Sequence, residues 1–150
     1  MANNERYFGF MLKDVSRRYV SRFEHSAAGL GLTLPHCKIL VYLSRHEGLS
    51  QARLAELTDL EPMTVVRLLD VMERDGLIER RSSTEDRRLK RVFLCPQAEP
   101  ALAEIWRIAD CTRAEAFSGF TEQEKEHFFL MMERIQKNLQ NLASESSSEC

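Results

Sequence analysis

The chain has 150 residues, of which 43% are hydrophobic and 29% are charged, as in ordinary soluble globular proteins. This length suits one folded domain better than two independent ones. The formal net charge of −2 excludes a polycation, so contact with nucleic acid would have to use local positive charge. Residues 79–91 carry such charge, with six Arg or Lys residues against three acidic ones.

The sequence lacks the marks of membrane, secreted and metal-binding proteins. No apolar run approaches the roughly 18 residues that span a bilayer, and the first residues lack the apolar stretch of a signal peptide. Four cysteines (Cys37, Cys95, Cys111 and Cys150) are widely spaced, which argues against a disulfide framework or a structural zinc site. We therefore expect a cytoplasmic protein with reduced thiols, and we expect no membrane contact, metal or cofactor.

The first third of the chain has the periodicity of two helices. Apolar residues at three- and four-residue steps predict a helix over residues 5–25, which two glycines then end. Thr33 is a suitable N-cap, and Pro35 fits a first helical turn because its missing N–H costs nothing there. A second helix is therefore predicted from Thr33 to about His46.

Two shorter helices follow in close succession. Ser50 is predicted to cap a helix over residues 51–57. A turn over residues 58–62 leads into a fourth helix, which ends at Asp75 with Gly76 as its C-terminal cap. This is the spacing of a helix-turn-helix.

The hydrophobic period then changes from that of a helix to that of a strand. Residues 77–81 and 89–95 are predicted strands, and the polar residues 82–86 between them form turns readily. The two strands make a β-hairpin. Because its tip is longer than a two-residue turn, we expect the hairpin to project.

Helical periodicity returns after the hairpin. A fifth helix is predicted over residues 96–117. Thr121 and Glu124 have the spacing of a capping box, which predicts a sixth helix from Thr121 to about Leu142. The Ser- and Glu-rich residues 144–150 are predicted to be a disordered tail.

The order of elements predicts a mainly α (α+β) fold, a winged helix-turn-helix whose flanking helices form a dimerisation platform. The predicted parts are an N-terminal dimerisation helix (1–32), a DNA-binding lobe (33–95), C-terminal dimerisation helices (96–143) and the tail (144–150). The first and sixth helices carry more large apolar residues than so small a chain can bury alone. A second copy would cover them, which independently predicts a homodimer.

The second helix of a helix-turn-helix lies in the major groove of DNA. Here that helix begins at Pro62, which sets its entry. Met63, Thr64 and Arg67 lie near its N-terminus and are predicted to face the bases, although the sequence leaves open whether Arg67 contacts a base or a phosphate. Arg53 of the preceding helix is a candidate phosphate contact.

The hairpin is the sharper signal. A narrow, negatively charged minor groove favours a thin cationic probe and prefers Arg to Lys. Arg87 and Arg88 follow the tip, and the strands add Arg81 and Lys90 as further DNA-binding candidates. Asp86 is predicted to hold one guanidinium in a fixed orientation. Arg80 and Arg91 belong to the same basic stretch.

Four segments (49–57, 61–70, 75–81 and 86–92), in this order and spacing, resemble the MarR family, and its SlyA-like branch in particular. The resemblance implies a homodimer built from the first, fifth and sixth helices, with two DNA-binding lobes. It implies that Arg87 or Arg88 enters the minor groove and that Asp86 braces it. It also implies an effector pocket between platform and lobe, often for phenolic or aromatic anions.

The predicted function is therefore a sequence-specific transcriptional regulator that binds double-stranded DNA as a homodimer at an inverted repeat. A repressor relieved by a small aromatic or phenolic effector is the first reading, and activation by displacing another repressor is the second. Trp106 and Phe117 line either the effector pocket or the dimer core.

The sequence allows three other readings: an enzyme, a winged helix used only for protein contacts, and a thiol-based redox sensor. An enzyme would need a nucleophile with a base, paired carboxylates or a phosphate-binding glycine loop, and the sequence shows none, so no catalytic residue is predicted. A winged helix used only for protein contacts is the main alternative. A thiol-based redox sensor is the other alternative, with Cys37 beside His36 as the feature to examine.

Overall fold

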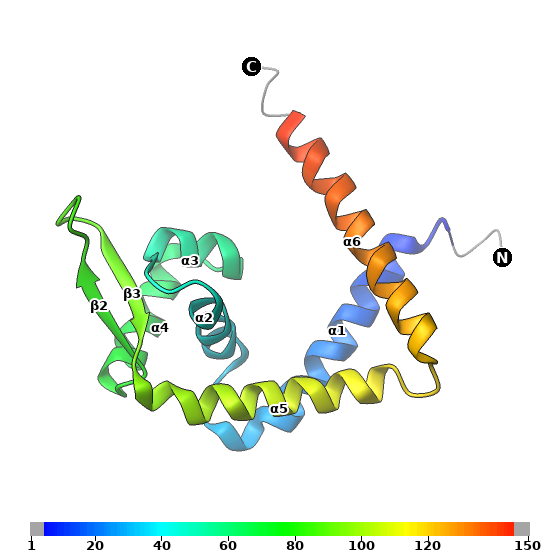
Figure 1. Cartoon of the computed structure of the whole chain (residues 1–150), viewed down its shortest axis with the longest axis horizontal. Coiled ribbons are helices and arrows are strands. Elements are labelled where there is room, and N and C mark those ends of the chain that lie inside the picture. Colours follow the sequence, from blue (N-terminus) through cyan, green and yellow to red (C-terminus); the bar gives the residue numbers. More distant parts are fainter. Residues whose placement is uncertain (1–4, 146–150) are drawn as a thin grey trace. The chain divides into compact units, whose positions relative to one another are not determined.

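The computed structural model describes residues 5–145, and within this range the chain forms six α-helices and three short strands (Figure 1). The helices are α1 (Phe8–Ala27), α2 (Leu34–Arg45), α3 (Gln51–Thr58), α4 (Pro62–Arg74), α5 (Glu99–Ala116) and α6 (Glu122–Glu145). The strands are β1 (Leu49–Ser50), β2 (Ile78–Ser82) and β3 (Lys90–Leu94). Two 3-10 turns, η1 (Ala28–Leu30) and η2 (Pro96–Ala98), follow α1 and precede α5.

The chain divides into two structural units inside α5, between Thr112 and Arg113. The first unit has a continuous apolar core. Its fully buried members come from α2, α3, α4 and both hairpin strands: Ile39, Leu40, Leu43, Leu54, Val65, Leu69, Met72, Ile78 and Val92. Phe23 of α1 and Ile105 of α5 extend the same core. The helix-turn-helix and the hairpin are thus held together by one set of packed side chains.

The sheet is antiparallel, with strand order β1-β3-β2. Arg80 of β2 lies opposite Val92 of β3, and Ser82 lies opposite Lys90. The two-residue strand β1 was not predicted. It forms because the free edge of β3 accepts pairing from Leu49 and Ser50, a contact between distant residues that leaves no local pattern.

The helix starts follow the sequence signals closely. The Ser50 hydroxyl accepts the Arg53 N–H at 3.1 Å, so the predicted cap of α3 is confirmed. The predicted capping box of α6 is confirmed too: the Thr121 N–H donates to Glu124 Oε2 at 2.7 Å, and the Glu124 N–H donates to Thr121 Oγ1 at 3.3 Å.

The second unit contains the turn from α5 to α6. Four phenylalanines (Phe117, Phe120, Phe128 and Phe129) contact one another there, with ring centroids 5.3 to 5.8 Å apart. Phe117 belongs to this cluster. Helix α6 includes Ser144 and Glu145, and the rest of the predicted tail, 146–150, lies outside the described residues. None of the described helices is long and apolar enough to cross a membrane.

Candidate nucleic-acid interface

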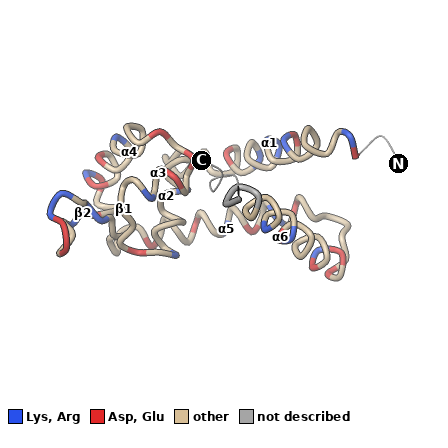
Figure 2. Tube along the Cα trace, turned by 90° about the horizontal axis from the view of Figure 1, so that it is seen from above, with Lys and Arg blue, Asp and Glu red and all other residues tan. Residues whose placement is uncertain are grey.

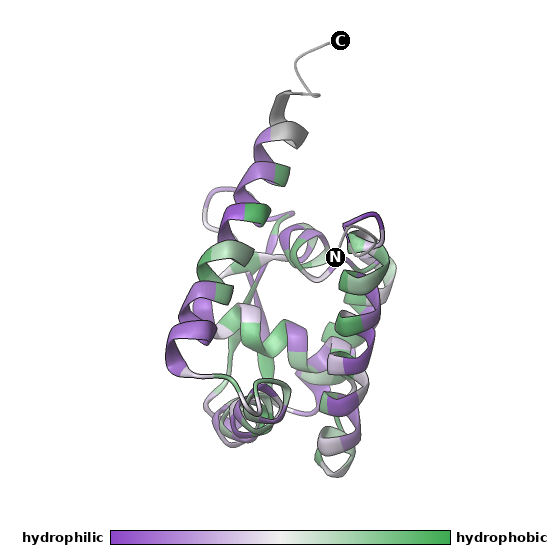
Figure 3. Ribbon diagram, turned by 90° about the vertical axis from the view of Figure 1, so that its right-hand side faces the viewer, coloured by the Kyte–Doolittle hydropathy of each residue, from purple (hydrophilic) through white to green (hydrophobic). Residues whose placement is uncertain are grey.

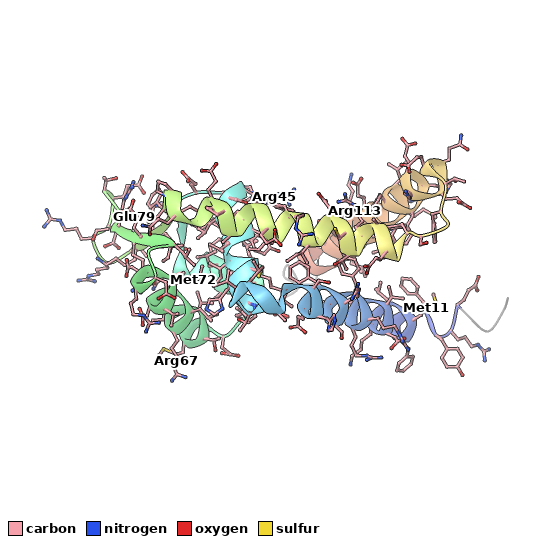
Figure 4. All side chains as sticks on the ribbon, turned by 90° about the horizontal axis from the view of Figure 1, so that it is seen from below. Met11, Arg45, Arg67, Met72, Glu79 and Arg113 are labelled. Carbon is pink, nitrogen blue, oxygen red and sulfur yellow. The ribbon has the colours of Figure 1, made fainter. Side chains whose placement is uncertain are left out.

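Helix α4 presents one face to the core and the other to solvent. Val65, Leu69 and Met72 are buried at three- and four-residue steps, and this fixes the rotation of the helix. The residues predicted to read bases consequently face outward. Pro62, Thr64 and Arg67 are exposed, the Met63 side chain is 64% exposed, and Arg67 projects from the helix surface (Figure 4).

The turn between α3 and α4 is built from buried and left-handed residues. Thr58 is 1% exposed, and its hydroxyl donates to the Leu54 carbonyl at 2.6 Å. Asp59 has φ of 56°, the left-handed conformation that ends a helix, and the Leu60 N–H donates to the Ala55 carbonyl at 3.1 Å. These bonds set the direction in which α4 starts.

The two strands of the hairpin continue into an ordered loop. The Ser83 N–H donates to the Leu89 carbonyl at 2.9 Å, and the Leu89 N–H donates to the Asp86 carbonyl at 3.0 Å. The Ser83 side chain is buried. Figure 2 shows charges of both signs in this loop. These contacts define the path of the loop backbone.

Asp86 acts on the backbone of the loop. Its carboxylate accepts the Arg88 N–H at 2.9 Å, which shapes the turn. The predicted pairing with a guanidinium is not formed in this structure, because the short Asp side chain reaches the nearby N–H while both arginine side chains extend into solvent. Asp86 thus places Arg87 and Arg88 through the chain rather than through a salt bridge.

The basic side chains differ in whether they have partners within the chain. Among the described residues, the guanidinium groups of Arg67, Arg87 and Arg88 make no hydrogen bond or ion pair. The other candidates do have partners. Arg53 pairs with Glu56 at 2.7 Å, Lys90 Nζ donates to Ser82 Oγ at 2.8 Å, and Arg81 contacts Glu79 and lies 4.4 Å over the Phe93 ring.

Two arginines of the basic stretch serve the fold. Arg91 Nη1 donates to the Gly48 carbonyl at 3.0 Å and so joins β3 to the loop before β1. Arg80 is held by Glu73 and Asp70 of α4. These two arginines were not among the predicted DNA contacts, but a run of arginines gives no sign of their partners Gly48, Asp70 and Glu73, which are distant in sequence.

The first unit also contains a pocket with a cavity volume of about 320 Å³. Its lining includes Tyr19 of α1, Lys38 and Arg45 of α2, and Trp106 of α5. Trp106 therefore lies at a pocket. Lys38, Tyr42 and Arg45 were missed, although their spacing places them on one face of a helix and could have revealed them.

Cys37 also lines this pocket and is 2% exposed. Burial raises the pKa of its thiol, which disfavours the thiolate form. A redox-sensing thiol needs the opposite environment, and the burial of Cys37 is typical of a cysteine that packs as a small apolar side chain. Among residues 5–145, His, Cys, Asp and Glu side chains form no group of three that would hold a metal ion.

A helix-turn-helix with an exposed outer face, joined to an ordered hairpin with free arginines, defines the DNA-binding winged helix class of transcriptional regulators. Comparisons narrow this class. A sequence model of the MarR family matches residues 30–89. The transcriptional regulator PA3341, for which a crystal structure exists, has 34% sequence identity to this chain. The match covers 90% of this chain and 99% of that one, with a TM-score of 0.79. The chain belongs to the MarR family, as the motif segments predicted.

Two further structures agree. A MarR-family transcriptional regulator from Silicibacter pomeroyi is 26% identical over 89% of this chain and 90% of that one, with a TM-score of 0.77. The transcriptional regulator SlyA is 22% identical over 88% of this chain and 93% of that one, with a TM-score of 0.75. SlyA shares the fold, and assignment to the SlyA-like branch stays a prediction. These relatives are transcriptional regulators rather than enzymes.

Proposed function

We propose that this protein binds an inverted-repeat operator as a homodimer and regulates transcription from it. One observation carries the proposal: Arg67, Arg87 and Arg88 are exposed, without partners among the described residues, and mounted on two elements that share one core. Guanidinium groups that have no partner within the chain are available to contact phosphates and base edges. Pro62, Met63 and Thr64 complete the surface that enters the major groove, and Arg53, Arg81 and Lys90 supply contacts at its edges.

The proposal of a homodimer is supported by apolar side chains that one protomer leaves exposed. In α1 these include Phe10, which is 75% exposed, and Met11. In α6 they include Leu130 and Leu139, which are 61% and 60% exposed. Figure 3 shows apolar positions along both helices. A second copy would cover such surfaces, so residues 1–32 and 96–143 are assigned to dimerisation, with residues 33–95 as the DNA-binding lobe.

The proposed operator binding is tested by selecting bound duplexes from a randomised pool and then titrating them at several salt concentrations. We expect a near-palindrome with half-sites about 34 Å, or one helical turn, apart. Weak binding without sequence preference that vanishes at moderate salt would instead reduce the basic hairpin to an electrostatic patch. The winged helix would then be assigned to protein contacts.

We further propose that the pocket of the first unit takes a small aromatic or phenolic anion that relieves repression. Lys38 and Arg45 supply positive charge, while Tyr19, Tyr42 and Trp106 supply aromatic faces. Trp106 is the one tryptophan in the sequence, so its fluorescence reports occupancy directly. Titration with benzoate and 4-hydroxybenzoate is expected to change this fluorescence in the wild type and far less in Arg45→Met. The exposed, charge-matched variant Arg74→Met is the control.

A further inference from the structure

Arg80 joins three elements of the DNA-binding lobe. It lies in β2, and its Nε and Nη2 both donate to Glu73 Oε2, at 3.0 and 2.6 Å. Its Nη2 also donates to Asp70 Oδ1 at 2.6 Å, and its Nη1 donates to Gln51 Oε1 at 3.3 Å. One guanidinium thus connects the hairpin to α4 and to the first residue of α3.

The backbone strengthens this connection. The Arg80 N–H donates to Glu73 Oε1 at 2.9 Å, so the two oxygens of one carboxylate hold both the main chain and the side chain of Arg80. Charge-assisted bonds of this kind are shorter and stronger than neutral ones, and the fork of Arg fixes their direction. The Arg80 side chain is only 21% exposed, which also sets it apart from the free arginines of the hairpin loop.

The contacts of Arg80 affect the proposed DNA binding because they join the two elements that carry the predicted DNA contacts. Asp70 and Glu73 are three residues apart, so they lie on one side of α4, the helix that carries Met63, Thr64 and Arg67. Arg80 pairs with Val92 across the hairpin, near the base from which the loop with Arg87 and Arg88 extends. The angle between hairpin and helix therefore sets how both groups of DNA contacts fit one duplex.

We propose that Arg80 is a positioning residue that clamps the hairpin to α4 at a fixed angle and thereby gives the protein its preference for operator over random DNA. This inference rests on the proposed DNA binding. A direct phosphate contact by Arg80 is the competing role. It needs only positive charge, which Lys would preserve, whereas the clamp needs the fork that Lys lacks.

Two variants separate these roles. Arg80→Lys keeps the charge and loses the fork. Glu73→Gln removes a negative charge from the lobe, so electrostatics alone predicts tighter DNA binding, whereas the clamp predicts weaker operator binding. Arg74→Lys is the matched control, because Arg74 is an exposed arginine of α4 that pairs only with the adjacent Asp75 among the described residues.

The affinity of each variant is measured for the selected operator and for random duplex, at a temperature where melting curves show the variant folded. We expect Arg80→Lys and Glu73→Gln to lose about ten-fold or more in operator affinity, about 1.4 kcal/mol, without loss of random-duplex affinity. If Arg80 and Glu73 only stabilised the fold, the ratio of operator affinity to random-duplex affinity would not change in the folded variants. If Glu73→Gln does not fold, Asp70→Asn replaces it, since Asp70 is 56% exposed and costs less to alter.

Operator affinity in Arg80→Lys equal to that of the wild type, or tighter operator binding by Glu73→Gln, overturns the positioning role. The test also distinguishes this failure from failure of the proposed function. A wild type with no preferred sequence overturns both, whereas a wild-type preference that Arg80→Lys retains overturns only the role of Arg80.

Discussion

His36 sits where a capping box normally has Glu or Gln. Its Nδ1 accepts the Thr33 N–H at 3.3 Å and lies 2.7 Å from the Thr33 hydroxyl, so the cap needs Nδ1 without a proton. Partial burial lowers the pKa of His36, while the charge of Asp75 opposes this to a smaller extent. The neutral ring is therefore the form that the folded protein favours.

We expect the free energy of unfolding to fall as the pH falls below about 6.5, the ordinary pKa of His. In the pH range between the lowered pKa of His36 in the folded protein and its ordinary pKa in the unfolded chain, the unfolded chain binds more protons than the folded one. The free energy of unfolding therefore rises with pH in this range and reaches its full value above the pKa of the unfolded chain. Denaturant melts at a series of pH values measure this. His36→Gln keeps an acceptor for the Thr33 N–H and should flatten the profile, whereas the exposed control His25→Gln should not.

Arg87 is the single side chain that we most expect to contact DNA. Its side chain is exposed, has no described partner and stands on a loop that hydrogen bonds already order. Arg87→Ala is expected to weaken binding to operator and random duplex alike and to reduce the salt slope by about one per protomer. Arg74→Ala removes a similar exposed charge as a control. Unchanged affinity and slope in Arg87→Ala would show that the hairpin tip does not reach DNA.

The junction between α4 and β2 depends on one backbone conformation. Gly76 has φ of 75°, and a Cβ there would clash with Gln97 Oε1. The Gln97 side chain can move, but the left-handed backbone disfavours any L side chain by about 1–2 kcal/mol. Gly76→Ala should therefore lower the free energy of unfolding by about that amount in urea melts. Gly29→Ala, with no atom nearby and no left-handed φ, is the control. Equal stability in both variants would contradict this reading.

Elements with a local cause were predictable from the sequence. The caps at Ser50 and Thr121 formed as expected, because the cap and its N–H partner lie within three residues. Strand β1 was missed, since it exists only through pairing with β3. The pairing of Arg80 with α4 was not predicted for a similar reason: adjacent strand residues face opposite sides, and the sequence does not show which side meets α4. For Asp86 the structure shows a carboxylate that accepts the Arg88 N–H, and its role in orienting a guanidinium on DNA stays a prediction.

Helices α1 and α6 both carry large apolar side chains that one chain leaves exposed. A single chain leaves Phe10, Leu130 and Leu139 largely exposed, which monomeric proteins tend to avoid over large contiguous patches. If a second copy covers these residues, each dimer presents two DNA-binding lobes and reads a two-fold symmetric site. Dimerisation and tight operator binding should then be lost together.

Leu139→Asp tests this link by placing a charge on the exposed apolar face of α6. We expect sedimentation to show monomers where the wild type is a dimer, because a buried unpaired carboxylate opposes association. Operator affinity should fall steeply with the loss of the second lobe, while helix content and the affinity of one lobe for random duplex persist. Gln136→Glu adds a charge to the same helix at an exposed polar position and should remain dimeric. A Leu139→Asp monomer with full operator affinity would mean that one lobe reads the operator alone, and the apolar face of α6 would then serve another partner.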